Sequence, residues 1–103
     1  VALNADTRDF ITEKEFALMK PDTILINTAR GPVVNETALA NALKQGKIVA
    51  AATDVYGAEP PLKPENPLFG VPNLIMLPHI GFATEEAFIL RLGIVVKNVE
   101  LFV

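Results

Sequence analysis

One stretch, Ile24–Gly31 with the sequence ILINTARG, constrains the possible folds most strongly. It opens with three consecutive apolar residues, a pattern typical of a parallel strand that is covered on both faces. Polar and small residues follow, and Arg30 with Gly31-Pro32 ends the strand. In α/β sheets, ligands bind just outside the carboxyl ends of the parallel strands. Arg30 could therefore hold a carboxylate with its planar guanidinium, although a solvated surface arginine would give the same pattern.

Helix signals lie on both sides of this strand. Thr12-Glu-Lys-Glu15 is a capping box, which predicts a helix that begins there and stops before Pro21. Asn35 is expected to cap a second helix, with Gly46 at its C-terminal end. A third helix is predicted from Thr84 towards the end of the chain, with apolar residues on nearly every face.

The predicted strands alternate with these helices. We expect the last residues of a strand at 1–3, and strands near 23–28, 48–55 and 74–77. A long irregular loop, 56–72, holds five of the eight prolines. This order predicts an α/β fold, a partial Rossmann-type parallel sheet with flanking helices and right-handed crossovers.

Composition excludes several classes of function. A net charge of −3 offers no basic surface for nucleic acid. The absence of cysteine rules out disulfides and thiolate metal sites, and we expect no metal centre. Arg91 and Lys97 interrupt the apolar C-terminal region, so no membrane span is expected. No signal peptide is visible, which suggests a cytoplasmic protein. The chain starts at Val1 without Met, so we expect a fragment of a longer protein.

Polar residues follow three of the predicted strands. Arg30 follows one, Asp54 ends the next with Glu59 soon after, and His79 follows the last. Carboxyl ends of parallel strands share one edge of the sheet, so these residues could converge on one crevice. Each also has a simple structural interpretation: a lone histidine is more often structural, and either carboxylate could be a loop cap or a solvated side chain.

Together, these residue types suit one kind of chemistry. A carboxylate beside a histidine stabilises the imidazolium form, which a general acid near neutral pH requires. A nearby arginine would hold a substrate carboxylate and polarise an adjacent carbonyl. The set suits reduction of a 2-oxo acid or oxidation of a 2-hydroxy acid, but it does not identify the source of the hydride.

Several segments in the same order resemble the D-isomer-specific 2-hydroxyacid dehydrogenases. The three signature blocks are Ile24–Gly31, Asp54–Pro60 with the sequence DVYGAEP, and Pro78–Gly81 with the sequence PHIG. The connecting segments Ala2–Arg8 and Val33–Glu36 are similar to the same family. The resemblance covers essentially the whole chain.

This resemblance implies a Rossmann-type coenzyme domain with NAD or NADP as cofactor and a small 2-oxo or 2-hydroxy acid as substrate. It also implies catalytic roles for three residues. Arg30 would bind the substrate carboxylate, His79 would be the acid/base, and Glu59 would orient His79. We also expect a homo-oligomer. The resemblance places the cofactor against Thr28, Ala29, Arg30, Asp54, His79, Ile80 and Gly81.

The chain also departs from the family. Phe82 stands where a second glycine is usual, and the six glycines never occur as G-x-G, so the phosphate-binding fingerprint is absent. We therefore interpret residues 1–103 as the carboxyl-terminal half of a coenzyme domain, without a substrate domain. Two alternatives remain open: a nucleotide-sensing interaction protein, like the family's co-repressor relatives, and a folded fragment that is inactive alone.

Overall fold

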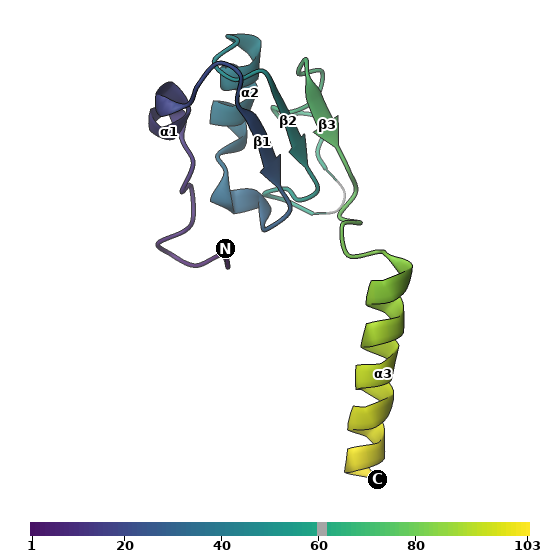
Figure 1. The fold of residues 1–103 in the computed structure, drawn as a ribbon. Helices are drawn as coiled ribbons and strands as arrows, with labels where there is room; N and C mark the ends of the chain where they lie inside the picture. The colour runs from purple at the N-terminus through teal and green to yellow at the C-terminus, as the bar shows by residue number, and fades with distance from the viewer. Residues whose placement is uncertain (60–61) are drawn as a thin grey trace.

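A three-stranded parallel sheet forms the centre of the molecule (Figure 1). The computed structural model describes residues 1–59 and 62–103. The strands β1 (Ile24–Asn27), β2 (Ala50–Thr53) and β3 (Leu74–Met76) lie in that order, and every pairing is parallel. The predicted α/β class and parallel sheet are confirmed, although each strand is shorter than predicted.

The helices begin where their caps predicted. In α1 (Glu13–Leu18) the capping box is complete, and α2 (Glu36–Lys44) begins after Asn35, whose side chain accepts the Ala38 amide. Gly46 has a φ of 64° and follows the last residues of α2, as predicted for a C-terminal cap. The long helix α3 (Glu85–Phe102) is capped by Thr84. A short 3-10 helix η1 (Gly31–Val33), which was not predicted, follows β1.

The hydrophobic core lies between α2 and one face of the sheet. Phe16 from α1, Leu39 from α2 and Ile48 before β2 are all buried, and Leu68 from the long loop joins them. Helix α2 is apolar on the face that it turns to this core. The helices therefore cover one face of the sheet, and polar loops lie at the carboxyl ends of its strands.

The opposite face of the sheet is open. Ile24 and Ile26 of β1 are 63% and 69% exposed, and Ile75 of β3 is 62% exposed. With Val49, these residues define what we call the open sheet face, which lines a shallow hollow. The prediction that β1 is covered on both faces is therefore wrong within the described residues, because no described helix packs there.

The predicted strand at residues 1–3 is also absent. Asn4 accepts the amides of Asp6 and Thr7, and the Thr7 hydroxyl donates to the Ala2 carbonyl, which folds this segment into a turn. The chain then runs beside η1, where Ile11 forms an isolated parallel bridge with Val34. Local side-chain hydrogen bonds thus hold the start of the chain in a turn, and residues 1–3 form no strand beside β1.

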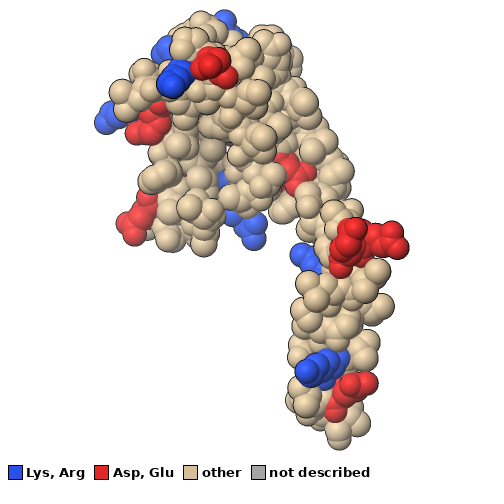
Figure 2. All heavy atoms as spheres, viewed as in Figure 1, with Lys and Arg blue, Asp and Glu red and all other residues tan. Residues whose placement is uncertain are grey.

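Helix α3 extends away from the rest of the molecule (Figure 1). None of its residues is buried, and the molecule measures 57 × 27 × 27 Å. Figure 2 shows α3 as a column with only a few charged side chains. Across the described parts of the chain, no helix combines the length and apolar character needed to cross a membrane.

Candidate active site

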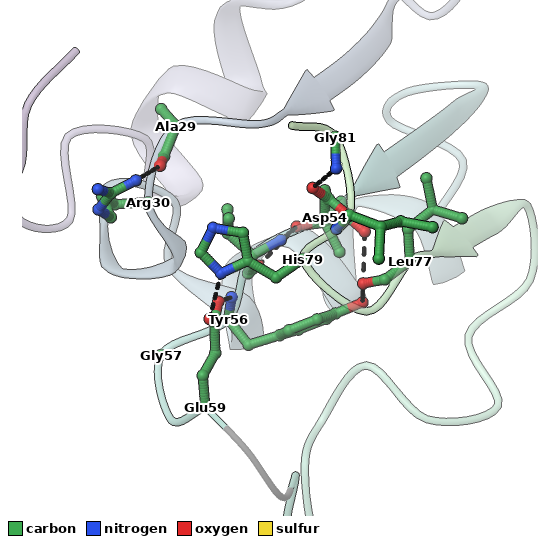
Figure 3. Close-up of polar contacts among 12 residues, drawn as sticks. Ala29, Arg30, Asp54, Tyr56, Gly57, Glu59, Leu77, His79 and Gly81 are labelled. Carbon is green, nitrogen blue, oxygen red and sulfur yellow. Dashed lines mark hydrogen bonds and ion pairs between the residues drawn. The ribbon is translucent and has the colours of Figure 1, made fainter. Parts of the chain in front are cut away.

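Polar side chains meet where β2 and β3 end, and Tyr56 holds the two loops together (Figure 3). The buried Tyr56 hydroxyl donates to the Leu77 carbonyl at 2.7 Å and approaches the Thr53 carbonyl at 3.3 Å. Its burial raises the pKa of Tyr56, so the phenol stays protonated as a donor. This bridge fixes the segment after β3 relative to the segment after β2.

His79 and Glu59 form an ion pair at this edge. The distance between His79 Nδ1 and Glu59 Oε2 is 2.5 Å, and the Tyr56 amide donates to Glu59 Oε1 at 2.7 Å. His79 adopts a φ of 57°, which is uncommon for a residue with a side chain and is often found at functional sites. The predicted partnership of Glu59 with His79 is therefore present as a contact.

The surroundings of Glu59 favour its charged form. Desolvation acts to raise its pKa, but the hydrogen bonds from His79 and Tyr56 and the positive charge of Arg30 outweigh this effect. The pKa of Glu59 is consequently below its ordinary value. The carboxylate can therefore remain ionised as the counter-charge of a protonated imidazole.

Asp54 anchors the loop that follows His79. Its Oδ1 accepts the Ile80 amide at 2.8 Å, and its Oδ2 accepts the Gly81 amide at 2.7 Å. Burial opposes the charge, but these two hydrogen bonds and the nearby His79 lower the pKa of Asp54. A Cβ on Gly81 would lie only 2.9 Å from Asp54 Oδ2, so a side chain at position 81 would force this hydrogen-bonded carboxylate to shift. Asp54 thus positions the backbone beside His79.

A cavity of about 440 Å³ opens beside the ion pair. Its walls are largely apolar, with Glu59 and His79 as the groups that can carry charge. Cavities of this size with a few converging polar groups are typical of small-molecule sites. The lining residues are Tyr56, Glu59, Leu62, Pro78, His79 and Phe82.

Arg30 lies shortly after the end of β1, at the same edge of the sheet as His79 (Figure 3). Its side chain is exposed, and Nη1 donates to the Ala29 carbonyl at 2.7 Å. Arg30, Ala29 and Thr28 line a second hollow of about 600 Å³ together with residues 1–3. The structure therefore brings the predicted site residues to one sheet edge but not into one hollow. Glu59 and His79 line the first hollow, whereas Arg30 lines the second. The residues that line neither are Asp54, Ile80 and Gly81.

Two supporting residues were not predicted. Tyr56 was recognised only as part of the DVYGAEP block, and Asn27 only as a polar residue near the end of β1. Buried Asn27 accepts the Ala29 amide and donates to the Arg30 carbonyl, which shapes the turn that carries Arg30. The sequence signal for Asn27 was a side-chain amide directly after the apolar run Ile24–Ile26. Part of the predicted 56–72 loop, positions 60–61, lies outside the described residues.

Comparisons with known proteins show which family the sequence resembles. The family model for the D-isomer specific 2-hydroxyacid dehydrogenase NAD binding domain matches residues 1–81. Glyoxylate reductase of Thermococcus litoralis is 47% identical over 99% of this chain, which spans 30% of that protein. D-3-phosphoglycerate dehydrogenase of Methanocaldococcus jannaschii is 49% identical over 84% of the chain, which spans 16% of it.

Solved structures show the same arrangement. An acyclic imino acid reductase, Bsp5, in complex with NADPH and D-Arg, superposes with a TM-score of 0.86 at 35% identity, covering 99% of this chain and 32% of that one. D-Lactate dehydrogenase with NAD+ from Lactobacillus jensenii gives 0.75 at 34% identity, covering 84% and 30%. The predicted Rossmann-type fold is confirmed, and the predicted NAD or NADP class agrees with the matched domain. The chain belongs to the NAD-binding-domain family of the D-isomer specific 2-hydroxyacid dehydrogenases.

Proposed function

We propose that this chain supplies the acid/base half of a dehydrogenase site that interconverts small 2-oxo and 2-hydroxy acids. The observation that supports this most strongly is the His79–Glu59 ion pair, 2.5 Å long, on the wall of a mostly apolar cavity. Because Glu59 engages Nδ1, Nε2 is the ring nitrogen left to exchange a proton with substrate. A paired, oriented imidazole beside a substrate-sized cavity is what a general acid requires.

The reaction assigns one step to each side chain. Arg30 binds the substrate carboxylate, and His79 Nε2 donates its proton to the oxygen on carbon 2 as a hydride reaches that carbon. Glu59 balances the positive charge of the imidazolium before the transfer. The reverse direction returns the proton to His79. Each 2-oxo acid thus gains a hydride and a proton to become a 2-hydroxy acid.

The hydride would come from bound NADH or NADPH. Thr28, Ala29 and Arg30 border a hollow large enough for part of a dinucleotide, and the Asp54 carboxylate holds the Ile80 and Gly81 amides beside His79. We assign the nicotinamide end to these residues with Asp54 and Ile80. No G-x-G occurs among the 103 residues, so the pyrophosphate would need another segment.

We also propose that the chain functions within a larger polypeptide, as the carboxyl-terminal half of a coenzyme domain. It spans about 30% of the glyoxylate reductase it resembles and lacks a phosphate-binding fingerprint. On its own, the chain is expected to pair with a second copy through its open sheet face and α3. The expected surface of an 11.1 kDa monomer is about 5,700 Å². The chain exposes 7279 Å².

The chain thus exposes about 1,600 Å² more than a compact monomer of its mass. Covering that much surface on each of two chains would bury about 3,200 Å², an area within the range of obligate homodimers. Exposed apolar side chains on β1, β3 and α3 make the surface of these elements hydrophobic. These features support a second copy as the occupant when the chain is alone.

A graft tests the proposed activity. The matching segment of Thermococcus litoralis glyoxylate reductase is replaced by residues 1–103, giving what we call the grafted reductase. We expect glyoxylate-dependent oxidation of NADH or NADPH, followed at 340 nm. Binding of the dinucleotide without turnover of any small 2-oxo acid would contradict the proposal and favour a sensing role.

A further inference from the structure

We propose that Glu36, a residue outside the cavity, positions the His79–Glu59 pair by holding the loop that carries Glu59. Glu36 is the first residue of α2, on the rigid core side of the molecule. This inference rests on the proposed function of the pair. It gives a role to a residue that the sequence analysis placed only in the connecting segment Val33–Glu36 and that does not line the cavity.

The contacts of Glu36 connect α2 to two separate positions in the loop between β2 and β3, Gly57 and Asn66. Its Oε1 accepts the Gly57 amide at 2.6 Å, and its Oε2 accepts the Asn66 side-chain amide at 2.9 Å. Asn66 in turn accepts the Leu68 amide at 2.9 Å, and Leu68 is buried in the core. Both carboxylate oxygens are thus used, and each accepts a hydrogen bond from a different segment of the loop.

The loop needs such support because it has little structure of its own. No helix or strand lies in the described residues between β2 and β3, so Glu59 depends on side-chain contacts for its position. Gly57 is only two residues before Glu59, and a Cβ there would lie 3.4 Å from Glu36 Oε1. The Glu36–Gly57 bond therefore sets where the chain turns toward His79.

Glu36 would affect the His79–Glu59 pair only indirectly, through the loop that carries Glu59. Charge-assisted hydrogen bonds are shorter and stronger than neutral ones, so a carboxylate restrains two amides better than a neutral group would. Without Glu36, the Tyr56–Glu59 turn would keep its own hydrogen bond but lose its tie to α2. Glu59 would then populate positions out of reach of Nδ1. Glu36 touches neither substrate nor cofactor, so it is a positioning residue.

NMR on the 103-residue chain tests this role directly. His79 is the sole histidine, so its ring resonances can be assigned without overlap from another histidine. In Glu36→Ala we expect the Gly57 amide to exchange at least about tenfold faster with solvent, since it loses a charged acceptor. The proton between His79 Nδ1 and Glu59 should broaden or disappear. Glu36→Gln, which keeps one oxygen acceptor, should recover part of both signals.

Glu13→Ala is the matched control, because Glu13 is an exposed residue at the same first position of α1. It should leave both signals unchanged. The Ala51 amide, which donates to the Asn73 carbonyl, reports global unfolding and should keep its protection in every variant. If Glu36→Ala unfolds the chain, Asn66→Ala provides the milder test and should also weaken the His79 signal.

An unchanged His79 signal alongside faster Gly57 exchange would overturn the proposal and leave Glu36 with a purely structural contact. In the grafted reductase, Glu36→Ala should lower kcat about tenfold while the KM for NADH stays within about twofold. A grafted reductase without any turnover would refute the proposed function, whereas the NMR result would still decide the role of Glu36.

Discussion

The Glu59 carboxylate accepts hydrogen bonds from two directions, the His79 ring and the Tyr56 amide. Replacing it in the grafted reductase with Gln removes the counter-charge of the imidazolium but keeps the size of the side chain. We expect the acidic-to-neutral limb of the pH–rate profile for reduction to move to lower pH. Glu65→Gln, an exposed acid in the same loop, is the control. An unmoved profile in Glu59→Gln would remove Glu59 from the mechanism.

The same residue affects stability with a defined sign. The pKa of Glu59 in the folded chain is lowered, so its ionised form stabilises the fold above the ordinary pKa of the group. This contribution is lost as the pH falls through the lowered value. Asp54 follows the same rule, since its pKa is also lowered. The loops after β2 and β3 should therefore be the first parts of this edge to loosen in acid.

Arg30 combines an exposed guanidinium with a turn that Asn27 holds in place. In the grafted reductase, Arg30→Ala and Arg30→Lys should both lower kcat/KM for glyoxylate at least about tenfold, because an ammonium cannot reproduce a two-bond carboxylate clamp. Arg8→Lys, an exposed change elsewhere, should have little effect. Near-normal kcat/KM in Arg30→Lys would refute the clamp.

At the scale of elements, the close contact between η1 and the segment that follows β2 depends on one glycine, Gly31. A Cβ on Gly31 would lie 1.9 Å from the Tyr56 carbonyl carbon, so two backbones meet there without room for a side chain. Gly31→Ala should lower the free energy of unfolding by about 1–3 kcal/mol or more, since a tightly packed backbone cannot yield easily. Urea unfolding at fixed protein concentration measures the loss.

Gly93 provides the comparison for that experiment. It lies within α3 with no atom within 4 Å of an added Cβ. Gly93→Ala should therefore be neutral or raise stability by about 0.5–1 kcal/mol, because alanine favours helix more than glycine does. Equal effects of the two substitutions would show that the Tyr56 backbone does not restrict position 31.

The elements were predictable where local chemistry determines them. The caps at Thr12, Asn35 and Thr84 mark helix starts because a side-chain oxygen satisfies free amides within a few residues. The parallel order followed from the alternation of strands and helices. Of the site, the Glu59–His79 contact was predicted through the family resemblance rather than from spacing.

The predictions that failed depend partly on distant packing and, for residues 1–3, on local hydrogen bonds. Three apolar residues in β1 predict burial but cannot say whether a helix covers each face, and here one face is open. The segment 1–3 resembles a strand, yet the Asn4–Thr7 hydrogen bonds hold the start of the chain in a turn. The clasp of Asp54 on the Ile80 and Gly81 amides joins residues far apart in sequence, which no local pattern reveals.

At the scale of the whole molecule, the chain exposes more surface than a compact monomer of its mass, 7279 Å² against about 5,700 Å², and large apolar side chains are exposed on β1, β3 and α3. The open sheet face and α3 should therefore drive association to a dimer or higher oligomer at micromolar concentration. Sedimentation equilibrium should report this association. We expect the dinucleotide affinity to be weaker than micromolar, because the sequence contains no G-x-G fingerprint for the pyrophosphate. A strict monomer at high micromolar concentration, or micromolar affinity, would contradict this account.

The most direct measurement of the central claim is steady-state turnover of the grafted reductase with and without His79. His79→Ala should lower kcat by about 10²–10⁴-fold, the usual contribution of a positioned acid/base group, while the affinity for the dinucleotide changes little. The kcat value comes from steady-state kinetics with glyoxylate as the varied substrate. The dinucleotide affinity comes from a binding titration followed by fluorescence. A loss of kcat below about tenfold would contradict the assignment of His79 as the proton donor.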